Sequence, residues 1–389
     1  MPGPPAQSMT WTDVCARRLD RHGLSVPAAA ARHADVVAAM CGAHAQVLSA
    51  AELSVGLRIA GGTRTDVRHA LWTERSLVKT FGPRGTVHLL PARDLPMWAA
   101  ALSAIPQPPP SPFPAGAAMT SEQTEQVIAA IAAALTDTEL TIGELSEAVV
   151  DGTGPWAGDL VLLAFQTNWP RWRQAITTAA NRGVLCFGAN RGRQVTYTAP
   201  RTWVPGFRPA DGQAALADLV GHYLHAYGPA SPRQFARWLG GPARWAADLF
   251  ESLGDRLEPV ELNGNIAWVA AGDTARPARR PAGLRLLPYF DAYQVGSHPR
   301  ELLFPGRAAD RALTRGQAGT FPVLLMGGIV AGVWHHRRSG RNLNVTVEPF
   351  GALTAAQRRQ LDDQVARIGD VLEGTPRLTI GTVTAGPHA

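Results

Sequence analysis

The sequence predicts an α+β protein in which three tandem winged-helix units precede a C-terminal β-rich, barrel-like domain. An order of helices followed by a strand hairpin occurs three times along the chain. The pattern then changes to a series of strands from Leu284 onward. At 389 residues the chain is also too long for one ordinary hydrophobic core, which favours several modules.

The first unit is expected over residues 10–104, after a disordered N-terminus at residues 1–9. Residues 34–40 and 50–59 have the apolar spacing of helices. A third helix, capped near Thr65, leads into the strand-like stretches SLVKTF and TVHLLP, which the turn GPRG joins. Three helices followed by a hairpin are typical of a winged helix.

Two further copies of this order follow a proline-rich linker at residues 105–120. The second is expected over residues 121–209, where the capping box TIGE begins a helix and VLCFGANRGRQVTYTAP forms a hairpin. The third is expected over residues 210–272, where SPRQ is another capping box and a hairpin turns on Asn263-Gly264. The copies share the order of their elements and no detectable sequence repeat.

A second linker, residues 273–283, is expected to separate these units from the β-rich domain at residues 284–389. Its strand-like stretches include FPVLLM, IVAGVWHH and NLNVTVEPF. One helix, TAAQRRQLDDQVARIGDVL, and a last strand, RLTIGTV, follow. The hairpin at residues 333–345 carries a basic turn, which makes it a candidate for contact with nucleic acid.

The composition favours a nucleic-acid partner. The formal charge is +6, and Lys79 is the only lysine, so 37 − 1 = 36 of the basic residues are arginine. Arginine makes planar, bidentate contacts to phosphate and guanine. Three winged helices in one chain also allow a monomer to surround a duplex without a symmetric partner. We therefore expect double-stranded DNA to be bound by a monomer.

Several classes of protein are disfavoured. Three scattered cysteines without a Cys-x-x-Cys motif argue against a disulfide framework or a zinc site, and they favour a reducing compartment. The first residues lack the pattern of a signal peptide, and no apolar stretch is long enough to span a bilayer. We expect a cytoplasmic, nucleoid-associated protein that needs no cofactor or metal. A single lysine leaves almost no nucleophile for Schiff-base chemistry, so water would attack any glycosidic bond.

The stretch CGAHAQVLSA contains the candidate catalytic residues, His44 and Gln46. If the preceding helix continues, His44 is a histidine that packs at the helix end, and Gln46 points elsewhere. If Gly42 ends the helix, the next residues are extended, and His44 and Gln46 point to the same side with Ala45 turned away. Spacing alone leaves both interpretations open.

A longer stretch, MCGAHAQVLSAAELSVGLRIAGG followed by ALWTERSLVKTFGPRGTVHLLPARDLPMW, resembles the start of the bacterial helix-turn-helix DNA glycosylases of the AlkZ and YcaQ group. Members of that family have a glutamine–apolar–glutamine or glutamine–apolar–aspartate triplet before a capped helix. They also have a wing with Arg-Gly-Thr-x-His-Leu, which is found here at residues 84–89. LLPYFDAY, at residues 286–293, fits their C-terminal region.

The resemblance implies hydrolysis of the N-glycosidic bond of N7-alkylated purines, including bulky guanine adducts of DNA-alkylating natural products from which such enzymes protect their producers. One departure from the family pattern is that His44 stands where the family has its first glutamine. An N7-alkylguanine is already cationic and leaves without a general acid, so the enzyme has to position water and stabilise an oxocarbenium-like sugar. We hypothesise that Gln46 holds the water and that neutral His44 orients it or accepts its proton late.

The candidate DNA-binding residues lie in the first wing and in the C-terminal hairpin. An alternative is that the arginines belong to solvated turns and that the wing histidine packs inside the wing. Arginine in the hairpin would favour the negative potential of a narrow minor groove. The set comprises Arg84, Thr86, His88, His335, His336, Arg337, Arg338 and Arg341.

The sequence thus predicts a monofunctional DNA glycosylase for bulky alkylpurines, acting in self-resistance or base excision repair. The alternative from another class is a non-catalytic winged-helix transcriptional regulator, and a third is a lesion-binding protein without activity. Release of free modified base would distinguish the first from the other two. The adduct, the unhooking of interstrand crosslinks, the consequence of histidine at position 44 and the gene-cluster context cannot be predicted from the sequence.

Overall fold

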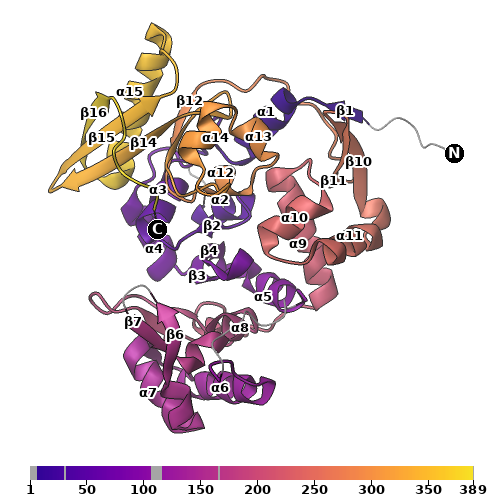
Figure 1. The fold of residues 1–389 in the computed structure, drawn as a ribbon, viewed down its shortest axis with the longest axis vertical. Coiled ribbons are helices and arrows are strands. Elements are labelled where there is room, and N and C mark those ends of the chain that lie inside the picture. Colours follow the sequence, from indigo (N-terminus) through magenta and orange to yellow (C-terminus); the bar gives the residue numbers. More distant parts are fainter. Residues whose placement is uncertain (1–6, 30–31, 107–115, 165–166, 389) are drawn as a thin grey trace.

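The computed structural model describes residues 7–29, 32–106, 116–164 and 167–388 and has a mixed helix-and-strand, α+β fold (Figure 1). Residues 1–6 of the expected disordered terminus and residues 107–115 of the expected proline-rich linker lie outside these ranges. No helix in the described part of the chain has the length and apolar character needed to cross a membrane. We refer below to four segments: the first (33–91), the second (121–198), the third (212–270) and the C-terminal segment (284–380).

The first segment has three helices and a small sheet. Its elements are α2 (His33–Ala39), β2 (Ala43–His44), α3 (Leu48–Gly56), α4 (Arg64–Trp72), β3 (Leu77–Phe81) and β4 (Val87–Pro91). The short β2 pairs with β4, so the sheet order is β2-β4-β3. The cap of α4 is Thr63 rather than Thr65, because the Thr63 hydroxyl accepts from the Asp66 N–H while the Asp66 carboxylate accepts from the Thr63 N–H.

The second segment follows the same order with an insertion. Its elements are α6 (Ser121–Ala134), β5 (Glu139–Thr141), α7 (Ile142–Thr153), β6 (Leu160–Ala164), β7 (Thr167–Pro170), α8 (Ile176–Asn181), β8 (Cys186–Phe187) and β9 (Thr196–Thr198). The TIGE capping box is confirmed at Thr141 and Glu144. The β6–β7 hairpin is not predicted, because Leu160 and Leu163 are exposed and the strands lack an alternating apolar face.

The third segment is completed by residues from the start of the chain. It contains α9 (Gly212–Tyr227), α10 (Pro232–Leu239), α11 (Ala243–Ser252), β10 (Leu257–Leu262) and β11 (Asn265–Ala270). The capping box at Ser231 and the turn at Asn263-Gly264 are confirmed. The expectation of disorder is wrong for residues 7–9, because β1 (Gln7–Met9) pairs with β10 in parallel and buries Met9.

Helices at both ends of the expected first unit lie against the third segment. They are α1 (Trp11–Arg21) and α5 (Leu95–Ser103), and both contact α9. The expected first unit, residues 10–104, therefore combines the first segment with two helices that pack on the third segment. Only Ala92–Asp94 separate β4 from α5, so in the sequence α5 looks like a continuation of the first unit.

The C-terminal segment is an open sheet covered by one long helix. Its strands are β12 (Leu284–Leu287), β13 (Val323–Met326), β14 (Ile329–Ser339), β15 (Asn342–Pro349) and β16 (Thr375–Ile380), in that spatial order. Neighbouring strands are antiparallel except for β15 and β16, between which α15 (Ala355–Leu372) forms the crossover. The sheet curls into a half-barrel and is not closed.

The first segment lies in the middle of the molecule (Figure 1). Its sheet and helices share one hydrophobic core with the second segment, and Leu90 and Val78 join a second core with α9 and α10. On the opposite side, Leu53 and Leu57 of α3 pack with Trp334 and α15 of the C-terminal segment. The second, third and C-terminal segments therefore all pack on the first segment, which contains β2.

A buried ion pair ties α3 to the C-terminal segment. Arg58 makes a bidentate contact to Asp291, with Nη1 at 2.9 Å from Oδ2 and Nη2 at 2.8 Å from Oδ1. Ser54 donates to the same Oδ2 at 2.7 Å, and both charged side chains are fully buried. Arg58 holds the pKa of Asp291 below its usual range despite the opposing effect of burial.

We predict that Asp291→Asn destabilises the protein by about 3–5 kcal/mol, because it leaves the Arg58 charge buried and uncompensated. The matched control is Asp248→Asn, which removes an exposed pair with Arg244 on α11 and should cost less than about 0.5 kcal/mol. Chemical denaturation measures both. Equal effects of the two substitutions would contradict the structural role of the buried pair.

Candidate active site

The backbone after α2 turns sharply and then becomes extended. Cys41 and Gly42 have positive φ angles of 55° and 94°, which ends the helix. Ala43 and His44 then form β2, and the Ala45 N–H donates to the Val87 carbonyl at 2.7 Å. This is the extended interpretation of the segment, and the helix-end alternative is wrong.

Burial alternates along this extended segment. Ala43 and Ala45 are buried in the core of the first segment, whereas His44 is half-buried and Gln46 is exposed. Alternate residues of an extended chain point to the same side. The strand ends at His44 and Gln46 lies at a bend two residues later, so Gln46 continues the alternation in burial without belonging to β2.

Aromatic rings surround His44. It stands opposite His88 in the β2–β4 register, with ring centroids 5.1 Å apart, and it stacks on Phe290 at 4.6 Å. Phe290 directly precedes Asp291 and has a φ of 55°, a conformation that costs a bulky residue energy. Its N–H donates to the Gly319 carbonyl at 2.8 Å, which helps to hold the ring against His44.

The imidazole of His44 is neutral near pH 7. Burial, followed by the positive charge of Arg84 and the nearby His388, lowers its pKa from 6.5 to about 4. Its Nδ1 is buried and has no hydrogen-bond partner among the described residues. The ring can therefore offer an unprotonated nitrogen as an acceptor.

A cavity of about 430 Å³ opens beside His44. Residues from the first wing, α10 and the C-terminal segment line it, among them Arg84, Thr86, Arg237, Phe290, His298 and Arg300. Of the sequence-predicted residues, the cavity brings together His44, Arg84 and Thr86. Gln46 lies outside its lining, and its Oε1 accepts from the Val87 N–H at 3.4 Å. That bond leaves the amide N–H groups of Gln46 free to donate.

Arg84 and Thr86 shape the turn of the first wing. Arg84 has a φ of 59°, and its Nη1 donates to the Trp238 carbonyl at 2.5 Å, at the C-terminal end of α10. The Thr86 hydroxyl donates to the Pro83 carbonyl at 3.0 Å. Arg84 is thus held in place while its side chain remains at the cavity.

His88 is not available for contact with DNA, which corrects the sequence-based expectation. It is buried, and its Nδ1 lies 2.9 Å from the Thr86 carbonyl. A Cβ at Gly82 would lie 2.8 Å from the same nitrogen, so the ring fills the space inside the wing. Burial and the neighbouring His44 and Arg84 hold the pKa of His88 well below its usual value. We infer that it supports His44.

The basic hairpin is formed by β14 and β15, and its five candidate residues differ in their surroundings. Arg337 and Arg341 are exposed. Arg338 instead donates to the backbone carbonyls of Leu372 and Glu373 at the end of α15, which gives it a structural role. His336 is half-buried and stacks on Trp334, whereas His335 is less enclosed.

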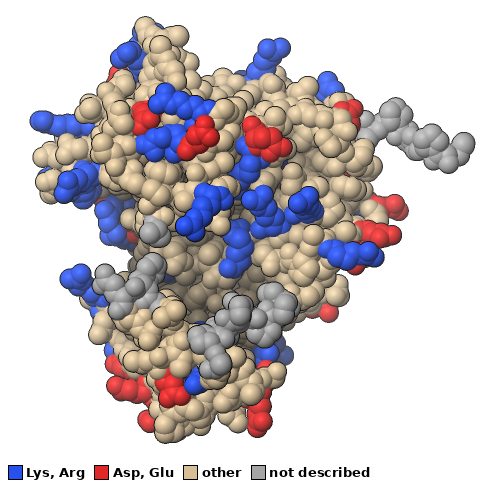
Figure 2. All heavy atoms as spheres, in the orientation of Figure 1, with Lys and Arg blue, Asp and Glu red and all other residues tan. Residues whose placement is uncertain are grey.

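Basic side chains gather around the hollow that crosses one face of the molecule (Figure 2). Many of the acidic side chains in this view lie toward the edges of the face.

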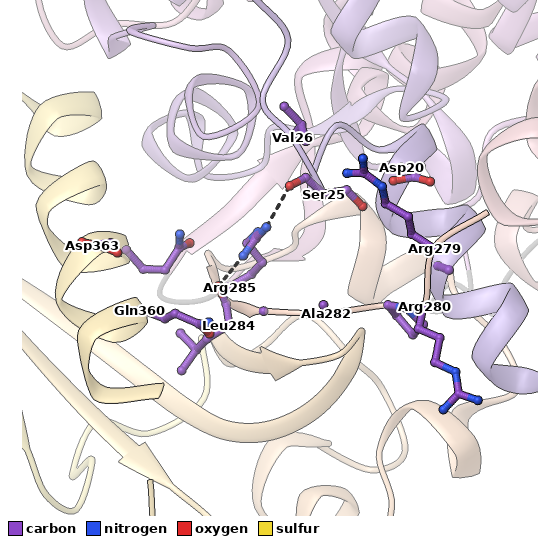
Figure 3. A pocket seen from close by; sticks show the side chains of 14 residues that line it. Asp20, Ser25, Val26, Arg279, Arg280, Ala282, Leu284, Arg285, Gln360 and Asp363 are labelled. Carbon is purple, nitrogen blue, oxygen red and sulfur yellow. Dashed lines mark hydrogen bonds between the residues drawn. The ribbon is translucent and has the colours of Figure 1, made fainter. Parts of the chain in front are cut away.

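Another cavity, of about 400 Å³, lies between α1 and α15 (Figure 3). There the Arg285 guanidinium group donates hydrogen bonds to the carbonyls of Ser25 and Leu284. None of the sequence-predicted site residues lines this second cavity.

Most of the cavity lining was missed by sequence reasoning, including the aromatic and basic residues Phe290, Arg237, His298 and Arg300. Phe290 lies inside the quoted stretch LLPYFDAY, which was a detectable signal. The others come from segments far apart in the chain, and no spacing links them to His44.

In the described part of the chain, no group of three or more His, Cys, Asp or Glu side chains could hold a metal ion.

A neutral histidine in a cavity lined by three arginines suits a protein that acts on a polyanion such as nucleic acid. Comparisons with known proteins agree. The family model described as DNA glycosylase AlkZ-like matches residues 37–371. An interstrand DNA cross-link repair glycosylase from Streptomyces sahachiroi is 32% identical over 337 residues, covering 84% of this chain and 87% of the relative.

A solved structure supports the same relationship. The Streptomyces sahachiroi DNA glycosylase AlkZ superposes with a TM-score of 0.78 at 28% identity, covering 96% of this chain and all of the solved chain. The protein described here is a DNA glycosylase. It belongs to the AlkZ-like family.

The low pKa of His44 gives a titration that can be measured. In the DNA-free protein, we predict that the imidazole stays neutral from pH 8 down to about 5 and takes up a proton near pH 4, because burial and Arg84 disfavour the cation. NMR of the ring nitrogens measures this, and the His44→Gln variant identifies the signal by its loss. A midpoint near the ordinary value of 6.5 would contradict the described environment.

Proposed function

We propose that this DNA glycosylase is monofunctional and hydrolyses the N-glycosidic bond of N7-alkylated purines. The observation that supports the proposal is the neutral His44 in the lining of a cationic cavity, with the exposed Gln46 two residues further along the chain. An N7-alkylated purine already carries a positive charge, so no general acid is needed to make it leave. The remaining task is to deliver water to the sugar.

The two side chains divide this task in the proposed mechanism. The free N–H groups of Gln46 donate to the oxygen of the attacking water, because its carboxamide oxygen faces the Val87 N–H. His44 accepts a hydrogen bond from the same water and takes its proton as the C–O bond forms. A neutral imidazole suits a cationic sugar, since a protonated one would repel it. Histidine can therefore replace the family's first glutamine without adding charge to the resting site.

We propose that three winged-helix units and the half-barrel surround the duplex in a monomer. The repeated order of helices and antiparallel strands in the first, second and third segments supports this description. The arginines around the hollow would contact phosphates on both sides of the lesion (Figure 2). Thr86 lies at the cavity wall and would face the DNA backbone near the reacting sugar.

We infer that the substrate is a bulky guanine adduct of a DNA-alkylating natural product. The Streptomyces relative is named for interstrand cross-link repair, and an adduct joined to both strands cannot easily leave the helix. A shallow site that reaches the bond with short side chains suits such a lesion. The biological role would be self-resistance or base excision repair in the cytoplasm, at the nucleoid.

We predict that His44→Ala and Gln46→Ala each slow base release about 10²- to 10⁴-fold with little change in DNA affinity, because they remove the groups that position and deprotonate water. Single-turnover release of 7-methylguanine and of bulkier adducts from duplex DNA measures this. The exposed His222→Ala on α9 is the control and should retain the wild-type rate. Wild-type rates in both site variants would overturn the catalytic assignment.

The hairpin formed by β14 and β15 is proposed to probe a DNA groove through Arg337 and Arg341. Both are exposed, and each neutralised phosphate contributes about 0.9 to the slope of log affinity against log salt concentration. We predict that the double variant Arg337→Gln, Arg341→Gln lowers the magnitude of this slope by about 1.8. Fluorescence anisotropy at several salt concentrations provides the measurement.

Arg338→Gln is the matched control for this hairpin. It removes the bonds to the carbonyls of Leu372 and Glu373, so it should lower the melting temperature and leave the salt slope unchanged. If the double variant keeps the wild-type slope, Arg337 and Arg341 do not contact phosphate.

A further inference from the structure

Three arginines and no carboxylate line the cavity beside His44. Arg84 comes from the turn between β3 and β4, Arg237 from the last turn of α10, and Arg300 from the first turn of α13 (Arg300–Leu303). None of the described residues that line this cavity is Asp or Glu. The protein therefore leaves this concentration of positive charge uncompensated at the site.

Two of the three guanidinium groups are fixed by backbone carbonyls. Arg84 donates to the Trp238 carbonyl, and Arg300 donates to the carbonyls of Gln294, Val295 and Ser297. Arg237 is exposed and forms no hydrogen bond or ion pair with the part of the chain that the structure describes. The cavity thus has a rigid cationic wall and one free guanidinium group.

The positive potential acts on every ionisable neighbour. Burial, followed by the charges of Arg300 and Arg237, lowers the pKa of His298 to about 2. The pKa of Arg300 falls to about 9 because of burial and then because of Arg237 and Arg84. The same potential would oppose both a cationic alkylpurine and an oxocarbenium-like sugar. An anion seated among the arginines would reverse this effect.

We propose that Arg84, Arg237 and Arg300 bind the phosphodiester group adjacent to the target nucleotide. This inference rests on the proposed function, because it places the glycosidic bond above His44. DNA supplies one phosphate per nucleotide, so the substrate itself brings the missing anion, and guanidinium groups bind phosphate through paired N–H donors. The bound phosphate offsets the arginine charges and leaves a net environment that tolerates the cationic sugar.

A double-mutant cycle between protein and DNA tests this contact. The protein change is Arg237→Gln, and the DNA change is a single neutral methylphosphonate placed in turn on either side of a 7-methylguanine. With unmodified DNA, Arg237→Gln should lower kcat/KM about 10- to 100-fold, because a hydrogen bond to a charged group is lost. One methylphosphonate position should cause a similar loss with the wild-type protein and no further loss with the variant.

Two controls accompany the cycle. Arg233→Gln, an exposed arginine one turn earlier on α10 and outside the cavity lining, should keep the wild-type kcat/KM and its sensitivity to methylphosphonate. Arg237→Lys should recover part of the affinity, because it restores the charge without the planar donor pair.

The same four combinations of protein and DNA are also compared by their affinity, with a stable abasic-site analogue in place of the 7-methylguanine. This binding assay needs no bond cleavage. Coupling in this binding assay without release of 7-methylguanine would support the phosphate contact and reject the proposed substrate. Independent, additive effects of the two changes in both assays would overturn the contact.

Discussion

The buried contact between Arg58 and Asp291 fixes the relation between two parts of the chain that are far apart in sequence. Arg58 follows α3, which contacts the strand β2 that contains His44, and Asp291 follows the ring that stacks on His44. A bidentate pair tolerates little rotation of either partner. The pair thus fixes the orientation of Phe290, and through it the ring of His44 and the wall of the cavity. The cost of desolvating two charges is offset by the carboxylate's additional bonds to Ser54 and to the backbone of Tyr293.

The candidate site combines a neutral reacting group with strongly cationic surroundings. The two features support each other, because burial lowers the pKa of His44 and the positive potential around the cavity adds to this effect. Arg84 contributes to both, since it caps α10 and faces the cavity. Beside carboxylates, a histidine at this position would have a raised pKa, and its protonated imidazole would repel a cationic sugar. Here its surroundings keep it uncharged near neutral pH.

Local patterns predicted much of the fold, because capping boxes, the Asn263-Gly264 turn and the strands of the C-terminal segment are determined by neighbouring residues. Of the two open interpretations of the segment around His44, the continuing helix is excluded because Gly42 with its positive φ follows the end of α2, whereas the joint action of His44 and Gln46 stays a prediction. What the sequence could not predict depends on tertiary contacts. Arg237 reaches the cavity because α10 packs against the turn between β3 and β4, and His298 reaches it from the C-terminal segment, just before α13. The hairpin of β6 and β7 escaped notice because its exposed leucines do not form a buried stripe.

The pairing of β1 with β10 has a consequence for dividing the protein into smaller pieces. Gln7–Met9 supply the outer strand of a sheet whose other strands lie some 250 positions later, so the sheet closes a loop that contains the whole first and second segments. A fragment that began at Gly212 would expose the free edge of Leu257–Leu262 and its buried Val260, an arrangement that invites pairing with another copy. The third segment is therefore one structural unit that is built from two separate stretches of the chain. Recombination between relatives would have to exchange Gln7–Met9 and residues 212–270 together.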